Sequence, residues 1–157
     1  MEPSFEKLLV LLTESGARFV VVGGVAVTLH GYVRFTEDMD LLVATDSPNL
    51  DCVLRALSRF GKGHAAELSP ADFEDSEGAI RIVEEEESCH IDLFTRLSGK
   101  RYEDILPDAD TLNVRGRAVH YASKAALIAW KEASLREKDR LDALALRRLQ
   151  ANPGAFE

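Results

Sequence analysis

The sequence has only two cysteines and lacks any long hydrophobic run. Cys52 and Cys89 are too few for a disulfide framework, and no histidines stand at zinc-ligand spacing from them, so we expect two reduced thiols. No apolar segment approaches the roughly 20 residues needed to span a bilayer. The opening segment MEPSFEKLLVLLTES is too acidic and too interrupted for a secretory signal. These features predict a cytoplasmic protein with no membrane partner.

Positive charge is scarce outside one segment of the chain. The net charge is −8, yet residues 115–150 carry nine Lys or Arg against four Asp or Glu, a net of +5. A net acidic chain is a poor default binder of nucleic acid, because phosphate contacts require cations. The basic segment 115–150 suits a small polyanion such as a triphosphate, and it equally suits the solvated face of a helix pair.

The chain does contain enough hydrophobic residues, 46% of 157, for one domain with a substantial core. Apolar periodicity and turn residues predict strands at 19–22, 39–44, 79–83, 89–94, 112–114 and 119–121. They predict helices at 3–15, 25–30, 47–60, 71–75, 123–136 and 138–150. We expect the acidic run 84–87 to turn a hairpin in solvent. This order predicts an α+β fold: a small mixed β-sheet with helices packed on one face, comprising a core at 1–122 and a C-terminal helix pair at 123–151 on the same single domain.

Two aspartates interrupt an apolar segment, where charge is costly. Asp38 and Asp40 lie two positions apart in FTEDMDLLV, so on a strand their carboxylates point to one face, while Met39 and Leu41 point to the other. Two adjacent carboxylates repel each other unless a cation neutralises them. Oxygen ligands of this kind suit Mg²⁺ or Mn²⁺ better than zinc. Alone, the pair is also typical of solvated acids at the start of a strand.

A third aspartate and a pair of glycines strengthen the metal hypothesis. Asp92 interrupts the apolar strand CHIDLF, and if this strand lies beside the first, three carboxylates share one face, as in a two-metal site. Gly23 and Gly24 follow the strand at 19–22 and open a short helix, where bare backbone N–H groups admit a phosphate. For the glycines taken alone, a simple strand-to-helix turn is the more common explanation.

The combined pattern resembles a known superfamily, the nucleotidyltransferases with the polymerase-β-like fold. The resemblance rests on Val22-Gly23-Gly24, Asp38-Met39-Asp40 and Asp92. More narrowly, GGVAVTLHGYVRFTEDMDLLV, HIDLF and WKEASLREKDRLDALAL resemble minimal bacterial nucleotidyltransferases of the abortive-infection toxin type. The resemblance covers roughly residues 19–146. One departure is Gly24, because many active members have serine there, whose hydroxyl can contact phosphate.

The resemblance implies roles for individual residues. It implies catalytic and metal-ligating roles for Asp38, Asp40 and Asp92, and phosphate contact by Gly23 and Gly24. It also implies three positions that hold or orient the nucleotide: Arg34, Thr36 and Lys131. The residues alone allow simpler roles for these three: a surface ion pair, a turn cap and a solvated lysine. We expect two structural histidines, His30 and His90, and a network that caps and joins the last two helices, made by Arg136, Lys138, Asp139 and Asp142.

The resulting hypothesis is a Mg²⁺- or Mn²⁺-dependent nucleotidyltransferase that uses an NTP. An acceptor hydroxyl attacks the α-phosphate and pyrophosphate leaves, while Asp92 completes the site and helps to deprotonate the acceptor. The acceptor stays open among tRNA, a protein and a small molecule, and so do an antitoxin partner and a role in a toxin–antitoxin pair or phage defence. One alternative is a non-catalytic nucleotide- or partner-binding module of the same fold. A phosphohydrolase is less favoured, because a Gly-Gly cradle suits a triphosphate.

Overall fold

The computed structural model describes residues 1–32, 36–133 and 137–154. Six strands form one mixed sheet in the order β3-β4-β2-β1-β6-β5. The strands are β1 (Phe19–Val22), β2 (Asp38–Val43), β3 (Ala79–Glu84), β4 (Cys89–Phe94), β5 (Asp110–Val114) and β6 (Arg117–Tyr121). The pairs β2–β4 and β1–β6 are parallel, and the other neighbouring strands are antiparallel. All six strands lie where the sequence predicts them, to within about two residues.

The described residues also contain six α-helices and several 3-10 turns; one helix precedes the first strand and two follow the last. The helices are α1 (Pro3–Glu14), α2 (Gly23–Leu29), α3 (Ser47–Leu57), α4 (Tyr102–Ile105), α5 (Lys124–Glu132) and α6 (Glu137–Ala151). The first turns of α3 and α5 are capped by Asp46 and Ser123, whose side chains accept hydrogen bonds from backbone N–H groups. The sequence does not predict α4, which is a single turn. Among the described helices, none combines the length and the apolar character needed to cross a membrane.

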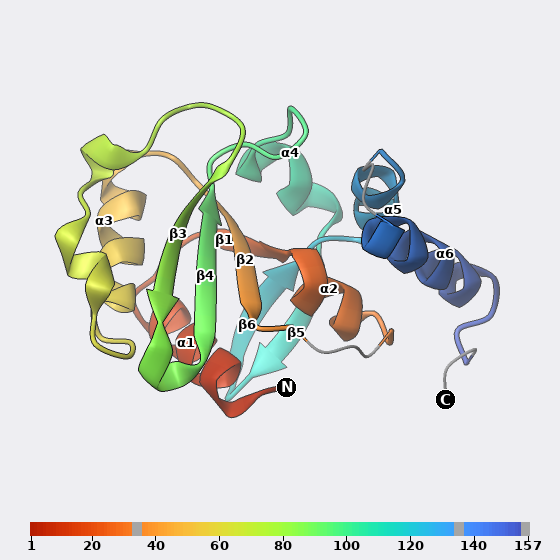
Figure 1. Cartoon of the computed structure of the whole chain (residues 1–157), viewed down its shortest axis with the longest axis horizontal. Helices are drawn as coiled ribbons and strands as arrows, with labels where there is room; N and C mark the ends of the chain where they lie inside the picture. Colours follow the sequence, from red (N-terminus) through yellow and green to blue (C-terminus); the bar gives the residue numbers. More distant parts are fainter. Residues whose placement is uncertain (33–35, 134–136, 155–157) are drawn as a thin grey trace.

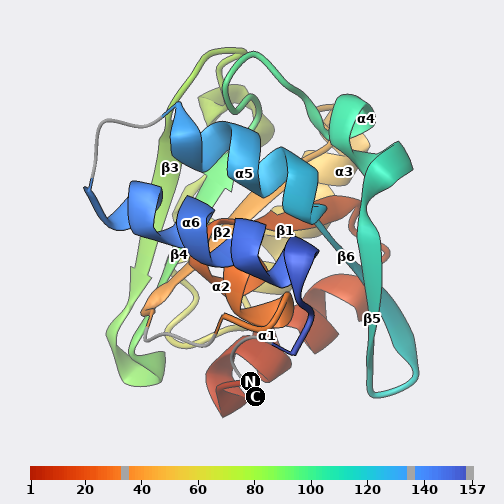
Figure 2. The ribbon, with the colours of Figure 1, turned by 90° about the vertical axis from the view of Figure 1, so that its right-hand side faces the viewer.

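The α+β class is confirmed, and the helices cover both faces of the sheet instead of the one face expected. Helices α1 and α3 pack against each other on one side, and α2, α5 and α6 lie on the other (Figure 1). Figure 2 shows α5 and α6 in front of the sheet, with the edge strands β3 and β5 at opposite sides. The physical reason lies in β1, whose four residues are all buried: a strand that is apolar on both faces needs cover on both.

The main core lies between the sheet and the helices α1 and α3. The apolar stripe of α1 (Phe5, Leu8, Leu9 and Leu12) is buried against this face, as its helical spacing predicts. Each fully buried leucine of this kind contributes about 1.5–3 kcal/mol relative to an exposed position. This packed face leaves the opposite side of β2 and β4 free to carry polar side chains.

The acidic run at 84–87 differs from the expectation of a solvated turn. Residues Glu85–Glu87 form a 3-10 turn, but Glu84 is only 1% exposed. Its carboxylate accepts hydrogen bonds from the backbone N–H groups of Lys62, at 2.8 Å, and His64, at 2.9 Å. Two charge-assisted hydrogen bonds offset the cost of burying this carboxylate, and sequence pattern gives no sign of such distant partners.

Candidate active site

The parallel pairing of β2 with β4 brings three aspartates to one face of the sheet. Asp40 lies directly opposite Asp92, and Asp38 lies opposite His90. Met39, between the two acids of β2, is fully buried on the other face. The acids therefore meet through strand register, although Asp92 is more than fifty residues away in the sequence.

The electrostatics of the site show a surplus of negative charge. The pKa of Asp40 rises from its usual range to about 7, first because the carboxyl is buried. Its hydrogen bond with Asp92 and the charges of Asp92 and Asp38 raise the pKa further, and the charge of Lys131 opposes them. Burial and the neighbouring acids therefore favour the protonated form of the Asp40 carboxyl.

Gly23 brings the start of α2 against Asp40. Its φ of +67° lies in the left-handed region, which glycine adopts without strain. A Cβ at this position would stand 2.8 Å from Cγ and 3.0 Å from Cβ of Asp40. Gly24 follows inside the helix and is buried. Glycine is therefore required at position 23 so that the start of α2 can lie against the Asp40 carboxyl. A simple strand-to-helix turn would not require this close contact.

Lys131 is a buried lysine at the edge of the same site. It lies on α5, and its Nζ is 3.0 Å from Oδ1 of Asp139 and 3.3 Å from Oδ2 of Asp142, both on α6. It also lowers the pKa of Asp40, so its charge reaches the acids. Lys131 is therefore not the solvated lysine that the sequence alone allows. It is ion-paired and joins α5 to α6. The prediction for Arg136 lies outside the described residues, as does that for the side chain of Lys138.

Two residues that precede β2 in the sequence, Arg34 and Thr36, are predicted to hold or orient the nucleotide. Thr36 uses its hydroxyl locally: it accepts a hydrogen bond from the Asp38 N–H at 3.2 Å and donates one to the Asp38 carbonyl at 3.3 Å. This contact fixes the backbone as it enters β2, which matches the turn cap considered for it. Arg34 lies outside the described residues.

Two residues at the site are not among the predicted functional ones. Arg81 on β3 donates from Nε to Oδ1 of Asp92 at 2.8 Å and from Nη2 to Oδ2 at 2.9 Å. Its Nη2 is also 3.5 Å from Oδ2 of Asp38, and these acids raise the arginine pKa further. His90, expected to be structural, has Nδ1 3.1 Å from Oδ1 of Asp38.

His30 is the other histidine expected to be structural. Its Nε2 forms a hydrogen bond with the carbonyl oxygen of Ala122 at 2.8 Å, which fits that expectation.

The position of Arg81 follows from the register of the β3–β4 hairpin, which the predicted strand ends at 83 and 89 miss by one residue. In this hairpin Glu84 pairs with Cys89, so counting three residues back along β3 and three forward along β4 pairs Arg81 with Asp92. Residues paired in this way share a face of the sheet. An arginine inside the apolar run AIRIV, directly across from an acid inside another apolar strand, is a signal of the same kind as Asp38 and Asp40.

The donor chemistry of the site fits a hard divalent ion. Three carboxylates lie on one face, and Asp40 and Asp92 are close enough to share a hydrogen bond. Across residues 1–32, 36–133 and 137–154, however, no group of three or more His, Cys, Asp or Glu is arranged as a metal-holding cluster. The guanidinium of Arg81 instead engages carboxylate oxygens of both Asp92 and Asp38.

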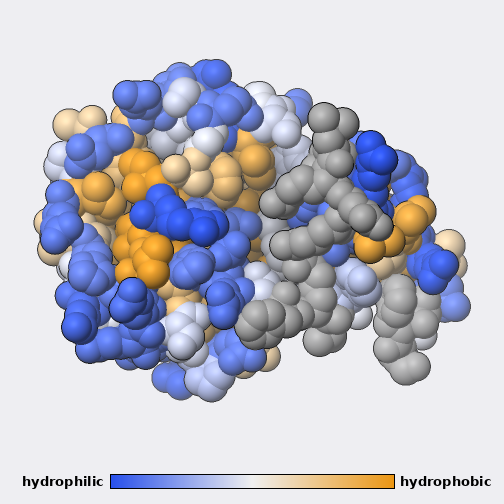
Figure 3. All heavy atoms as spheres, in the orientation of Figure 1, coloured by the Kyte–Doolittle hydropathy of each residue, from blue (hydrophilic) through white to orange (hydrophobic). Residues whose placement is uncertain are grey.

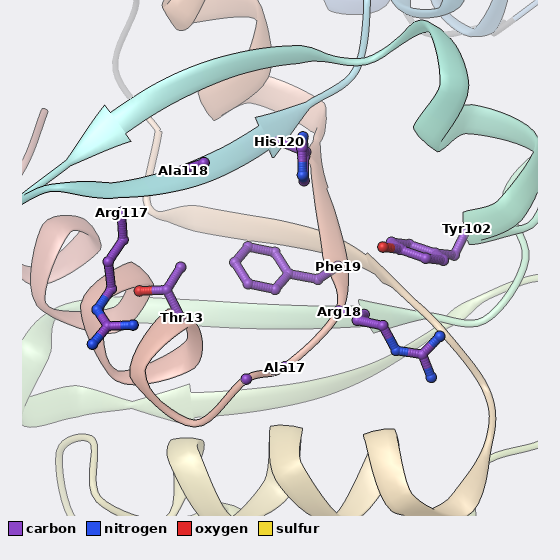
Figure 4. Close-up of a pocket in the computed structure, with 9 residues that line it drawn as sticks. Thr13, Ala17, Arg18, Phe19, Tyr102, Arg117, Ala118 and His120 are labelled. Atoms are coloured by element: carbon purple, nitrogen blue, oxygen red, sulfur yellow. The ribbon is translucent and has the colours of Figure 1, made fainter.

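A separate cavity of about 390 Å³ lies at the opposite end of β1 from Gly23. Figure 4 shows the Phe19 ring within it, between Thr13 and Arg117 on one side and Tyr102 on the other. The three site aspartates are not among its lining residues. Chemistry that depends on those carboxylates therefore belongs on the β2–β4 face and not in this cavity.

Comparison with solved structures defines the class of fold. The chain is similar to the lincosamide antibiotic adenylyltransferase LnuA, solved with lincomycin bound, at 17% identity over 94% of this chain and 96% of that one, with a TM-score of 0.62. It is also similar to an antigenic nucleotidyltransferase-like protein from Paracoccidioides brasiliensis, at 19% identity over 92% and 77% of the two chains, with a TM-score of 0.50. Both likenesses show a nucleotidyltransferase fold.

The family follows from the sequence itself. Residues 3–152 match the family described as nucleotidyl transferase of unknown function (DUF2204), and the chain belongs to that family. The predicted membership of the nucleotidyltransferase superfamily is thereby confirmed, and the protein is a nucleotidyltransferase. The narrower likeness to abortive-infection toxins stays a prediction. A comparison with curated proteins found no match.

Proposed function

We propose that this protein moves a nucleoside monophosphate from an NTP to an acceptor hydroxyl, with Mg²⁺ or Mn²⁺ held by Asp38, Asp40 and Asp92. The observation that carries the proposal is the strand register that sets Asp40 directly opposite Asp92, on the face that Asp38 shares. Burial, and after it the hydrogen bond and charge of Asp92 and the charge of Asp38, raise the pKa of Asp40, so bringing these acids together costs free energy. A divalent cation is the partner that relieves their repulsion.

The residues of the chain then have distinct tasks. A bound divalent ion would neutralise phosphate charge and favour ionisation of the acceptor hydroxyl. Asp92 accepts the proton of that hydroxyl as the new bond to the α-phosphorus forms, and the bond to the leaving pyrophosphate breaks. The N–H groups of Gly23 and Gly24 contact the phosphates in this proposal. Lys131 supplies a fixed positive charge beside the acids.

The proposed acceptor is a hydroxyl group on a small molecule. A net charge of −8 disfavours a polyanionic acceptor such as tRNA, although the basic segment 115–150 partly compensates. The similarity to an adenylyltransferase described as acting on a lincosamide antibiotic extends over nearly the whole of both chains, which supports a small acceptor. Protein and tRNA acceptors are the other outcomes of the test below.

The experiment incubates the purified protein with each α-labelled NTP, Mg²⁺ and fractionated cell lysate. Transfer of label to a small-molecule fraction, lost in Asp40→Asn while the variant still melts cooperatively, is the expected result. Undiminished transfer by Asp40→Asn would refute the assignment of the site. Nucleotide binding without pyrophosphate release would favour the non-catalytic module. The toxin–antitoxin role is tested separately, by growth arrest on expression that Asp40→Asn relieves.

A further inference from the structure

Arg81 occupies carboxylate oxygens that a divalent ion would need. Its guanidinium bonds both oxygens of Asp92, at 2.8 and 2.9 Å, and stands 3.5 Å from Oδ2 of Asp38. A carboxylate whose two oxygens each accept a bond from one arginine offers fewer lone pairs to a metal ion, and the positive guanidinium repels a cation beside it. The guanidinium and the ion are therefore competitors for the same ligands.

The surroundings of Arg81 allow it to leave. Its side chain is half exposed, whereas the Asp92 side chain beneath it is 9% exposed. On the same face of β3, Ala79 is exposed and Val83 is 40% exposed, so no packed layer holds the arginine in place. Figure 3 shows that hydrophobic and hydrophilic surface alternate on this side of the molecule. The guanidinium can turn outward without displacing a buried group.

We propose that Arg81 is a displaceable occupant of the metal site, and that it binds the phosphates of the NTP once the ion has taken its place. This inference rests on the proposed function, because it assumes that the acids hold a divalent ion. Removing the guanidinium from Asp92 leaves an arginine without its partner, and a phosphate is the anion that arrives with the ion. Arginine recognises phosphate through the same paired N–H groups that it uses for a carboxylate.

Displacement predicts two effects of opposite sign. Without nucleotide, Arg81→Gln removes a competitor, so we expect Mn²⁺ to bind more tightly, on the order of tenfold. That factor corresponds to the free energy of one charged hydrogen-bonded pair at a partly exposed position. With saturating metal, the same variant lacks a phosphate contact, so the nucleotide binds about tenfold more weakly. Loss of a merely structural contact would instead weaken both. Metal and nucleotide binding would be coupled through this one side chain.

The test measures Mn²⁺ affinity by titration calorimetry, and then the affinity of an α,β-methylene NTP analogue at saturating Mg²⁺. The four α,β-methylene nucleotides are screened first, and the one that the wild type binds is used. The matched control is Arg55→Gln, an exposed arginine on α3, which lies on the other side of the sheet. Arg81→Lys separates occupancy from charge, because lysine keeps the charge but lacks the paired donors.

Tighter Mn²⁺ binding and weaker nucleotide binding by Arg81→Gln, with Arg81→Lys between it and the wild type, support the proposal. Unchanged or weaker Mn²⁺ binding by Arg81→Gln overturns it, and so does an Arg81→Lys variant that equals the wild type. An unchanged nucleotide affinity of Arg81→Gln overturns the proposal that Arg81 binds the NTP phosphates after it leaves the acids. Asp40→Asn separates the two levels of inference. If Asp40→Asn binds Mn²⁺ as tightly as the wild type does, the proposed function fails. If Asp40→Asn loses Mn²⁺ binding while Arg81→Gln binds Mn²⁺ like the wild type, only the role proposed for Arg81 fails.

Discussion

Substituting Gly23 by alanine tests whether the start of α2 and the acid pair form one site. The added Cβ would stand 2.8 Å from the Cγ atom of Asp40, whereas ordinary contact begins at 3.4 Å. The carboxyl must therefore move by about 0.6 Å or more, or the helix must withdraw by a similar distance. The position also has a φ of +67°, which strains any residue other than glycine.

Two effects contribute to the unfolding free energy that Gly23→Ala loses. The left-handed backbone costs about 1–2 kcal/mol for alanine, and crowding in a packed site adds roughly 1–3 kcal/mol. We therefore expect Gly23→Ala to lose about 2–5 kcal/mol of unfolding free energy. Displacing a catalytic group by about 1 Å can cost roughly 100-fold in rate, so transfer should fall by about that factor.

The assay combines urea unfolding with transfer from α-labelled NTP under folded conditions. Gly16→Ala is the matched control, because Gly16 has a φ of +79° with nothing within 4 Å of an added Cβ. It should lose only the backbone part, about 1–2 kcal/mol, and keep its activity. If the two variants lose equal stability and Gly23→Ala retains full transfer, the close contact with Asp40 has no functional meaning.

Three further predictions concern charge and burial. Because the folded-state pKa of Asp40 is raised from its usual range to about 7, wild-type stability falls as pH rises from about 4 to 7; Asp40→Asn should match the wild type at pH 4 and exceed it by about 4 kcal/mol at pH 8, as measured by urea unfolding. An unchanged difference between those pH values would contradict the shift. Lys131→Met removes the cation paired with buried Asp142 and should lower the unfolding free energy by roughly 3 kcal/mol, of which Asp142→Asn restores part in the double variant; additive losses would argue against the pair. Burial raises the pKa of Cys89 to about 12, so iodoacetamide at pH 8 should modify the less buried Cys52 first and Cys89 only after unfolding, as followed by mass spectrometry; rapid native labelling of Cys89 would contradict this.

The strands and the meeting of the acids follow from sequence pattern because both depend on local rules. The short, β-branched apolar run FVVV favours a buried strand, and alternation in DMDLLV and CHIDLF assigns the acids to one face. The one assumption is that β2 and β4 are neighbours, which the structure shows. The family resemblance supplied the roles of the acids, which the fold by itself does not.

The remaining features depend on contacts between distant segments. Glu84 is buried because the N–H groups of Lys62 and His64 turn toward it, more than nineteen residues earlier in the chain. Lys131 is buried because α6 folds back and places two aspartates against it. Neither arrangement leaves a periodic signal, so pattern alone reads such residues as solvated. Arg81 meets Asp92 through the hairpin register that pairs Glu84 with Cys89, whereas the predicted strand ends at 83 and 89 would have set it opposite Ile91.

The most direct test of nucleotidyl transfer at these acids follows two labels in parallel reactions. With α-labelled NTP and Mg²⁺, the label should appear on the acceptor, and with γ-labelled NTP it should appear in pyrophosphate. Both signals should vanish in Asp40→Asn and persist in Asp51→Asn, a matched change at an exposed position of α3. Release of γ-label as inorganic phosphate, or full transfer by Asp40→Asn, would contradict the account.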